Sequence, residues 1–279
     1  MNKKRIDLLL VERGLAETRS LAQRLVMAGQ VRVNGEVVTK PSDNVLETAQ
    51  VAVDSGPPYV SRGGEKLAGA LAAFPVQVAG KVCADVGAST GGFTDCLLQN
   101  GAAKVYTIDV GHGILHWKLR TDPRVVVMER TNARHVERLP EPIELATVDA
   151  SFISLKILLP VIKAWFPSPP GPLSQSGEGE LPPPVRSGAE GEVLTLIKPQ
   201  FEAGKKEAAR GEGVIRDPAV HRAVLRDVLT FAQAEGFGVR GLIRSPLEGP
   251  KGNVEFLAWL VLEGEKENDL DGLVNRVVA

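Results

Sequence analysis

The sequence that decides the fold reads Asp85-Val86-Gly87-Ala88-Ser89-Thr90-Gly91-Gly92-Phe93-Thr94. The apolar run that leads into it, Val82 to Val86, predicts a buried strand, and the three glycines let the backbone turn tightly and come close to a ligand. The residues after Gly92 predict the start of a helix whose first amide groups face the same cavity. A second strand, Lys104 to Ile108, is followed by Asp109, a carboxylate placed to accept hydrogen bonds from ribose hydroxyls. The pattern therefore indicates a nucleotide pocket.

The ligand of this pocket is suggested by what the loop lacks. Asp85 stands where the dinucleotide fingerprint G-x-G-x-x-G has its first glycine, and no basic residue is present to bind a pyrophosphate. A ligand with an adenosine but no phosphates fits better, and we expect S-adenosylmethionine, its amino-acid end near Asp85 and its ribose at Asp109. The alternative is a tight turn that binds nothing. The predicted cofactor contacts are Asp85, Gly87, Ala88, Ser89, Thr90, Gly91, Gly92, Phe93, Asp109 and Asn132.

Length and composition are those of an ordinary globular protein. The chain has 279 residues, 43% of them apolar, which is enough for one large or two modest domains. Cys83 and Cys96 offer neither a disulfide framework nor a Cys-x-x-Cys metal site, so we expect the protein to be located in the reducing cytoplasm. We expect neither secretion nor a membrane span, because there is no signal-peptide pattern and no apolar run of about 18 residues. The four histidines show no ligand spacing with the cysteines, and no metal is expected.

Charge is distributed unevenly along the chain, although the net charge is only −1. Residues 1–40 carry eight Lys and Arg against four acidic residues, whereas the remainder carries 25 basic and 30 acidic residues. Such an asymmetry suggests that the amino-terminal segment contacts phosphates and that the larger part has another task.

The same amino-terminal segment predicts two short helices and a hairpin. An apolar run ends at Gly14, and Thr18 or Ser20 opens a second helix that ends at Gly29. The residues around Asn34-Gly35 alternate in hydrophobicity about a two-residue turn, which is the strongest short-range signal for a hairpin.

This segment resembles a known RNA-binding domain, the S4 domain, which is built as two helices and a hairpin. The resemblance rests on Arg5-Ile6-Asp7, Arg19-Ser20-Leu21-Ala22 and Gly29 to Gly35. It implies structured RNA as the partner. The alternative is a solvated basic face of a small helical unit. The predicted RNA-binding residues are Arg5, Arg19, Arg24 and Arg32, which could share one side of the unit, and Arg62 beyond it.

Composition also sets the expected domain boundaries. Residues 1–54 form the small α+β RNA-binding domain, and Gly56-Pro57-Pro58 makes residues 55–62 a stiff linker. Residues 63–268 predict an α/β, Rossmann-like domain with a mostly parallel sheet covered on both faces. Within it, about 167–192 is rich in Pro, Gly, Ser and Glu and is expected to be a mobile surface insertion. Residues 269–279 are expected to be a carboxy-terminal tail. Strands are expected at 82–86, 104–108, 125–128, 145–148, 193–197, 239–243 and 255–262, and a helix at about 219–235.

Four charged residues are expected at the carboxyl edge of this sheet. Asp149 and Lys198 each end a strand, and Glu255 begins or precedes the last one. Lys66 stands near the beginning of a helix, where a cation is unfavourable against the helix dipole. Each alone is more often a solvated residue, but two lysines and two carboxylates in one pocket are electrically balanced. Desolvation and the neighbouring ammonium would favour a neutral lysine that can accept a proton.

From Ser61 to Glu255 the chain resembles the FtsJ-type RNA 2′-O-methyltransferases, which use a Lys-Asp-Lys-Glu tetrad and the loop pattern Asp-x-Gly-Ala-x-x-Gly-Gly. With the amino-terminal domain, nearly the whole chain resembles the TlyA family, often labelled haemolysins. The signature segments are Ser61 to Leu67, Asp149 to Leu155 and Ile197 to Glu202. The long insertion departs from the compact form of the family, so the resemblance does not define the entry to the substrate channel.

The resemblance implies an enzyme that transfers a methyl group from S-adenosylmethionine to a ribose 2′-hydroxyl of cytidine in ribosomal RNA or ribosomal subunits. We expect Lys198 to take the hydroxyl proton, Asp149 and Lys66 to orient the reacting groups, and Glu255 to balance the lysines. Three alternatives remain. A membrane-active haemolysin would need an apolar or cationic amphipathic segment that the sequence lacks. A non-catalytic RNA-binding protein could keep the same residues, and a small-molecule methyltransferase would leave the basic amino terminus unexplained. The sequence leaves the modified nucleotide, the subunit and the oligomeric state undetermined.

Overall fold

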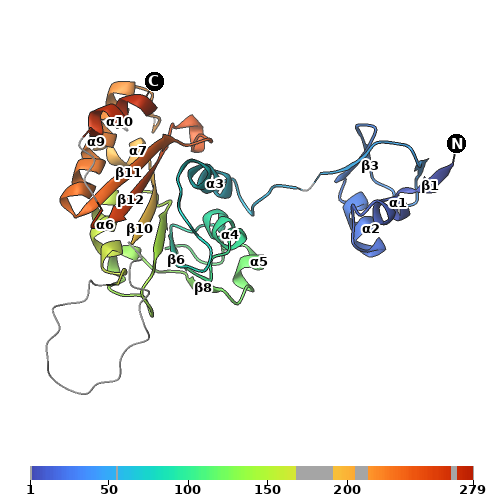
Figure 1. Ribbon diagram of the computed structural model, residues 1–279, viewed down its shortest axis with the longest axis horizontal. Coiled ribbons are helices and arrows are strands. Elements are labelled where there is room, and N and C mark those ends of the chain that lie inside the picture. Colours follow the sequence, from blue (N-terminus) through green and yellow to red (C-terminus); the bar gives the residue numbers. More distant parts are fainter. Residues whose placement is uncertain (1, 55, 168–190, 205–212, 265–268, 279) are drawn as a thin grey trace, which may run out of the picture. The chain divides into compact units, whose positions relative to one another are not determined.

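The structure is a computed structural model that describes residues 2–54, 56–167, 191–204, 213–264 and 269–278. The chain forms two compact units, Met1–Pro58 and Tyr59–Ala279 (Figure 1). The division between Pro58 and Tyr59 falls within the linker expected at 55–62. The insertion expected at 167–192 lies almost entirely outside the described residues.

The amino-terminal unit packs two helices against short antiparallel strands. Thr18 caps the second helix, because its Oγ1 accepts a hydrogen bond from the amide of Leu21 at 3.2 Å. Asn34 and Gly35 both have positive φ, 50° and 88°, as the predicted two-residue hairpin turn requires. The helices are α1 (Ile6–Glu12) and α2 (Arg19–Met27); the strands are β1 (Lys3–Arg5), β2 (Val31–Val33), β3 (Glu36–Val38), β4 (Asn44–Leu46) and β5 (Val51–Val53), with β1 beside β4 and β2 between β3 and β5.

The second unit is built on a seven-stranded sheet in the order β11-β12-β10-β9-β6-β7-β8. Only β12 runs in the opposite direction to the other six strands, so the sheet is mostly parallel, as predicted. The chain turns from β6 to β7 and β8 on one side and continues with β9 on the other, so β6 and β9 flank the topological switch point where such folds bind ligands. The strands are β6 (Val82–Val86), β7 (Lys104–Ile108), β8 (Val125–Met128), β9 (Leu145–Val148), β10 (Glu192–Ile197), β11 (Phe237–Arg244) and β12 (Phe256–Leu262).

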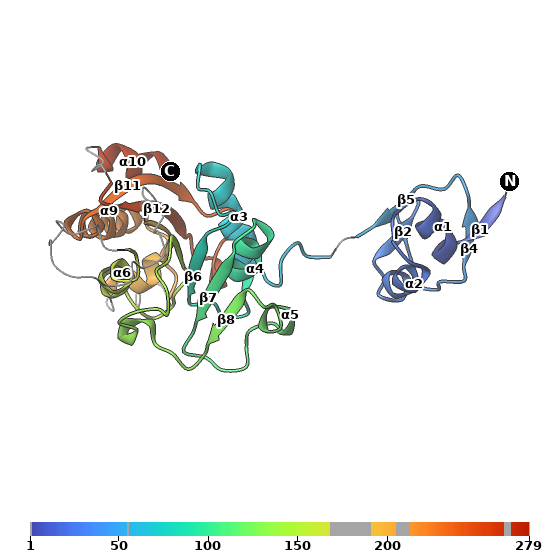
Figure 2. The same cartoon turned by 60° about the horizontal axis from the view of Figure 1, so that its bottom comes forward.

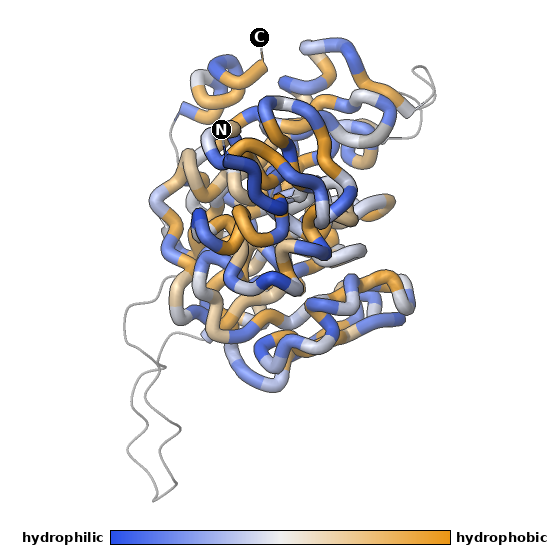
Figure 3. The backbone as a smooth tube through the Cα atoms, turned by 90° about the vertical axis from the view of Figure 1, so that its right-hand side faces the viewer, coloured by the Kyte–Doolittle hydropathy of each residue, from blue (hydrophilic) through white to orange (hydrophobic). Residues whose placement is uncertain are grey.

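Helices cover both faces of this sheet (Figure 2). Successive strand residues point to opposite faces, so Cys83 packs with the core under α3 and α4 while Ala84 packs with the core under α6 and α9. Hydrophobic and hydrophilic residues alternate in short runs along the chain (Figure 3), as expected of elements that pack an apolar side on a core. The helices are α3 (Gly63–Ala73), α4 (Gly92–Gln99), α5 (Trp117–Arg120), α6 (Leu155–Lys163), α7 (Pro199–Glu202), α9 (Pro218–Ala234) and α10 (Leu270–Val277), with 3-10 turns η1 (Ala133–His135) and η2 (Pro250–Gly252).

The expected carboxy-terminal tail is instead an element of this unit. Asp269 caps α10 by accepting a hydrogen bond from the amide of Gly272 at 2.7 Å, and Val274 is fully buried. The helix packs against α9 and β11. Its apolar residues, Leu270, Leu273, Val274 and Val277, have the i, i+3, i+4, i+7 spacing of an amphipathic helix, and this signal in the sequence was missed.

Candidate active site

The Gly-rich turn between β6 and α4 crosses the switch point with very little free space. Gly87 has a φ of 83°, and a Cβ there would lie 2.8 Å from the carbonyl oxygen of Asp149. A Cβ on Gly92 would lie 2.7 Å from the amide nitrogen of Gly64, at the start of α3. Glycine is required at both positions, because the turn passes directly between the end of β9 and the beginning of α3.

Two adjoining cavities open at this turn. The smaller, about 280 Å³, is lined by residues that follow β7, β8 and β9, among them Asp109, Asn132 and Ile153. The larger, about 620 Å³, extends across Arg62, the end of β10 and the start of β12. The two cavities share the residues Gly87, Ser89, Asp149, Ser151 and Phe152.

Most of the predicted cofactor contacts line these cavities. Asp109 accepts hydrogen bonds from the amides of Ser89, at 2.8 Å, and Gly111, at 2.7 Å, so it also fastens the Gly-rich turn to the loop after β7. Its carboxylate retains further acceptor capacity toward the smaller cavity. The predicted contacts that line one or both cavities are Gly87, Ala88, Ser89, Thr90, Gly92, Phe93, Asp109 and Asn132.

Asp85 and Gly91 are not among the residues described as lining either cavity. Asp85 is fully buried beneath the turn, where it accepts hydrogen bonds from the hydroxyls of Thr94, at 2.6 Å, and Thr147, at 3.2 Å. Burial, opposed by the Thr94 hydrogen bond and reinforced by the charge of Asp149, raises the pKa of Asp85 to about 7. The structure therefore gives Asp85 the role of supporting the turn, and its contact with the ligand stays a prediction.

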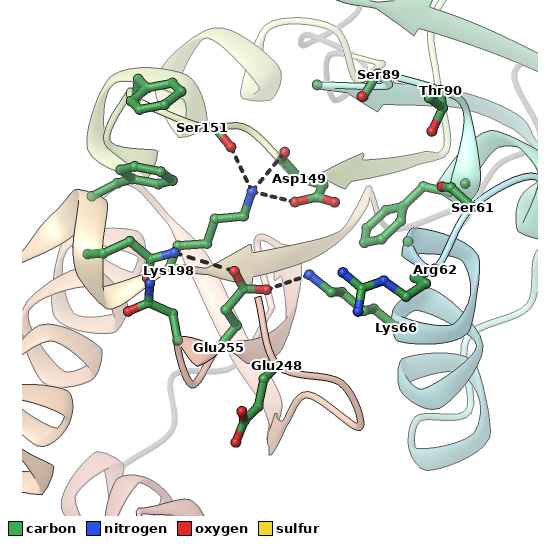
Figure 4. A pocket seen from close by; sticks show the side chains of 18 of the residues that line it. Ser61, Arg62, Lys66, Ser89, Thr90, Asp149, Ser151, Lys198, Glu248 and Glu255 are labelled. Atoms are coloured by element: carbon green, nitrogen blue, oxygen red, sulfur yellow. Dashed lines mark hydrogen bonds and ion pairs between the residues drawn. The ribbon is translucent and has the colours of Figure 1, made fainter. Parts of the chain in front are cut away.

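The four charged residues expected at the sheet edge meet in the larger cavity as two ion pairs (Figure 4). Lys66 Nζ donates to Glu255 Oε2 at 2.6 Å, and Lys198 Nζ lies 2.6 Å from Asp149 Oδ1. Lys66, Lys198 and Glu255 are each less than a tenth exposed. Each lysine thus has its own carboxylate, so the charges are compensated and the group tolerates burial.

Two residues that the sequence analysis did not single out complete these pairs. Lys198 Nζ also donates to Ser151 Oγ at 3.0 Å and to the Asp149 carbonyl at 3.2 Å. Gln200 Nε2 donates to Glu255 Oε1 at 3.4 Å. Both residues lie within two positions of Asp149 or Lys198, so the signature segments contained them.

Two aromatic rings stand at the rim of the same cavities. Phe152 is 91% exposed and has a positive φ of 64°, a conformation that is uncommon for a bulky residue. Its ring centroid lies 4.8 Å from that of Phe201, and both residues line the larger cavity. An exposed ring held in a strained conformation is a feature found at functional sites.

The mouth of the larger cavity carries excess positive charge. Arg62 and Lys251 both line it, both are exposed, and within the described ranges neither takes part in an ion pair. The acidic residue at the mouth, Glu248, lies 3.6 Å from Arg244. Because the four inner charges cancel, the two outer cations favour an anionic substrate.

Comparison with known proteins gives this geometry a family. The FtsJ-like methyltransferase profile matches residues 59–262, and the S4 domain profile matches residues 4–51. The chain belongs to the FtsJ-like methyltransferase family. It is an enzyme, an S-adenosylmethionine-dependent RNA methyltransferase of this family with an amino-terminal S4 domain, and the sequence-based prediction of family and enzyme class is confirmed.

Individual relatives extend over nearly the whole chain. The 16S/23S rRNA (cytidine-2′-O)-methyltransferase TlyA of Mycobacterium tuberculosis is 42% identical over 98% of this chain and 95% of its own length. Hemolysin A of Brachyspira hyodysenteriae is 38% identical over 92% of this chain and 100% of its own. A solved structure of a candidate hemolysin from Streptococcus thermophilus, 40% identical, superposes with a TM-score of 0.68 and covers 99% of this chain and 96% of that one.

The S4 domain places two of its four predicted RNA-binding arginines together. Arg5 and Arg19 both bind the fully buried carboxylate of Asp7, at 2.9 Å and 3.0 Å. Arg24 lies five residues after Arg19 on α2, which turns it about 140° around the helix. Arg32 instead pairs with Asp54 at 2.9 Å. The structure therefore brings Arg5 and Arg19 together at Asp7, and the RNA-binding role of the four arginines stays a prediction.

In the described part of the chain, no helix has the length and hydrophobicity needed to cross a membrane. The same residues contain no group of three or more His, Cys, Asp and Glu side chains arranged to bind a metal ion.

Proposed function

We propose that this methyltransferase modifies the ribose 2′-oxygen of a cytidine in ribosomal RNA. The observation that carries the proposal is the pair of lysine–carboxylate contacts, Lys66–Glu255 and Lys198–Asp149, in a cavity that adjoins the one containing Asp109. The relative from Mycobacterium tuberculosis is named as an rRNA (cytidine-2′-O)-methyltransferase, which supports the same substrate. Such a substrate implies that the enzyme works in the cytoplasm.

The smaller cavity fits the cofactor by its chemistry. Asp109 offers carboxylate oxygens for ribose hydroxyls, and Val110, Ile114 and Ile153 provide apolar surface for the adenine. Gly87 lets the backbone come close at the junction with the larger cavity, where the reactive end would lie. The cofactor supplies an electrophilic methyl group on a positively charged sulfur.

The tetrad then acts on the acceptor. In its neutral form Lys198 would accept the 2′-hydroxyl proton as the oxygen–carbon bond forms and the carbon–sulfur bond breaks. Asp149 and Ser151, which already contact Nζ at 2.6 Å and 3.0 Å, would hold the amine in position. Lys66, fixed by Glu255, would orient the attacking oxygen. Holding the three reacting atoms near a line can contribute up to roughly 10 kcal/mol.

Residues at the rim would hold the nucleotide. A ribose within a folded RNA reaches such a cavity only when its nucleotide is unstacked, and aromatic rings can then replace the lost base stacking. Phe152, exposed beside Phe201, is suited to this role. Arg62 and Lys251 would bind the flanking phosphates. In the S4 domain, Arg5, Arg19, Arg24 and Arg32 would bind structured RNA through its phosphates.

The decisive experiment is transfer of labelled methyl from S-adenosylmethionine to purified small and large ribosomal subunits. Label that appears in RNA with the intact protein and is lost in Lys198→Ala, while the cofactor still binds, supports the proposal and identifies the subunit. A matched control is Lys163→Ala, because this lysine donates to the carbonyl of Glu235 on the surface, remote from the cavities. Transfer that survives Lys198→Ala would refute the assigned base. Bound cofactor with no label in either subunit would favour a non-catalytic RNA-binding protein.

A further inference from the structure

Trp117, the first residue of α5, is unusually exposed. Its exposed fraction is 71%, although the neighbouring Leu115 and Leu119 are buried against the Gly-rich turn. The other two tryptophans, Trp165 and Trp259, each donate an indole hydrogen bond, at 2.8 Å and 3.0 Å. No such bond engages the Trp117 indole among the described residues. Trp117 therefore presents an accessible aromatic face beside the active site.

The charges around Trp117 are directed outward. Lys118 pairs with Asp95, and Arg120 pairs with Glu129. In both pairs the carboxylate is nearly covered, 3% and 11% exposed, while the cation is 58% and 38% exposed. Solvent therefore meets the cations of these pairs and is largely shielded from their carboxylates.

Arg130 adds a third cation to this surface. Its amide donates to the carbonyl of Gly111 at 2.9 Å, which places it beside the loop that leads into α5. The preceding residue, Glu129, holds the same loop by accepting a hydrogen bond from the amide of Gly113 at 2.9 Å. Arg130 is exposed, and none of the described side chains forms an ion pair with it. Trp117, Lys118, Arg120 and Arg130 are called the Trp117 surface below.

This surface adjoins both cavities of the active site. The amide of His116 donates to the carbonyl of Thr90, which lines the larger cavity. Val110 and Ile114, earlier in the same loop, line the smaller one. In Figure 2, α5 lies next to β8 at the edge of the sheet. A chain that crosses the Trp117 surface can therefore continue into the active site.

We infer that the Trp117 surface binds an unpaired segment of the RNA substrate, with one base stacked on Trp117 and neighbouring phosphates on Lys118, Arg120 and Arg130. The inference rests on the proposed function, because it takes the substrate to be RNA. Aromatic rings flanked by cations are how proteins bind single strands, since the rings stack on bases and the cations follow the backbone. A protein partner, or a second copy of this chain, would be favoured by an apolar surround instead of outward-facing cations.

The three tryptophans make the test direct. All of them lie beyond residue 58, so tryptophan emission of the full chain reports only on the methyltransferase unit, even if the S4 domain binds RNA too. A short single-stranded oligoribonucleotide should quench the emission, and the same strand annealed to its complement should quench much less at equal phosphate concentration. In Trp117→Phe, the remaining emission should not respond to the single strand.

A second readout separates stacking from a structural role. Trp117→Ala should raise the KM for ribosomal RNA by about 5- to 150-fold, the equivalent of about 1–3 kcal/mol per stacked base, with kcat little changed. Trp117→Phe should keep most of the affinity. Ile157→Ala, which removes a half-exposed apolar side chain on α6, is the matched control and should leave KM unchanged.

Three results would overturn the inference: no quenching by the single strand, equal quenching by the duplex, or a loss of self-association as the sole effect of Trp117→Ala. The proposed function can fail separately. If no subunit accepts a methyl group but the single strand still quenches Trp117, the RNA surface stands and the reaction assignment falls.

Discussion

Lys66 and Glu255 lie 189 positions apart in the sequence, yet Nζ of the lysine contacts Oε2 of the glutamate at 2.6 Å, and both side chains are almost completely buried. This contact joins the first turn of α3 to the residue before β12, inside the larger cavity. A Cβ on Gly249 would collide with Glu255 Oε1, so the glutamate is enclosed as well as paired.

Substitutions in this pair should separate stability from activity, because a second substitution should restore stability and not activity. Lys66→Met leaves the buried Glu255 carboxylate without its cation, and we expect a loss of about 3–5 kcal/mol in unfolding free energy. Adding Glu255→Gln removes the stranded charge and should recover most of that loss. Methyl transfer should be absent in both variants, because the orienting ammonium is gone. Urea unfolding and the methyl-transfer assay test this, and a double variant that regains activity would exclude a chemical role for Lys66.

Asp109 should control cofactor affinity. Asp109→Ala removes the ribose acceptor and the hydrogen bonds from the amides of Ser89 and Gly111. Losing hydrogen bonds to a charged group costs about 1.5–3 kcal/mol, which corresponds to roughly 10- to 150-fold weaker cofactor binding. Calorimetry with S-adenosylhomocysteine measures this, and Asp122→Ala, an acid outside both cavities, is the control.

A ligand that lacks the ribose hydroxyls separates the two effects of Asp109. It should bind the natural protein more weakly, but it should lose nothing further in Asp109→Ala if the carboxylate holds the ribose. Additive losses would mean that Asp109 acts only by fastening the turn.

Much of this architecture could be predicted because it follows from local patterns. The buried strands are continuous apolar runs, and the hairpin is marked by Asn34-Gly35. Asp149 and Lys198 follow parallel strands, whose carboxyl ends lie at one edge of the sheet. The pairing of each lysine with its own carboxylate could not be predicted, because it depends on distances between segments far apart in the chain. The exposure of Phe152 likewise depends on a left-handed backbone that its sequence does not favour.

Asp85 should make stability depend on pH. Its pKa in the folded protein, about 7, lies above the ordinary 3.8, so the folded state holds a proton that the unfolded state has released between those values. The free energy of unfolding should therefore fall as pH rises from about 4 to about 7. Above about pH 7 the destabilisation from the buried, charged Asp85 should be fully present. Asp85→Asn should remove this cost and be more stable than the natural protein at pH 8 by a few kcal/mol, but not at pH 4.

Asp122→Asn is the control of opposite sign. Hydrogen bonds from Arg124 lower the pKa of Asp122, so its carboxylate stabilises the folded state at pH values above 4. Urea unfolding followed by the emission of Trp165 and Trp259 reports on the right unit for both variants. A pH profile of Asp85→Asn parallel to that of the natural protein would show that Asp85 is charged throughout.

Asp7 is expected to organise the RNA-binding face of the S4 domain. Its buried carboxylate accepts from Arg5, at 3.0 Å and 2.9 Å, and at 3.0 Å from both Arg19 and Gln23. The Arg5 contacts in particular hold the pKa of Asp7 well below its usual range. A depressed pKa stabilises the fold at pH values above about 4, and this contribution is lost as pH falls further. Asp7→Asn should therefore destabilise α1 and α2 at pH 7 by about 1.5–3 kcal/mol, and the two proteins should converge in strong acid.

RNA binding distinguishes this organising role from a direct phosphate contact. Arg5→Ala or Arg19→Ala removes a cation, so the slope of log affinity against log salt should fall by about 0.7–0.9 for each phosphate that the variant no longer neutralises. Asp7→Asn keeps both cations but frees them to move, so affinity should fall while the slope is retained. Amide hydrogen exchange in α1 and α2 measures the stability effect. Filter binding across a salt series measures the RNA affinity and its salt slope. Tighter RNA binding by Asp7→Asn would mean that Asp7 competes with RNA for the arginines, because freeing them would then expose charge that the phosphates can use.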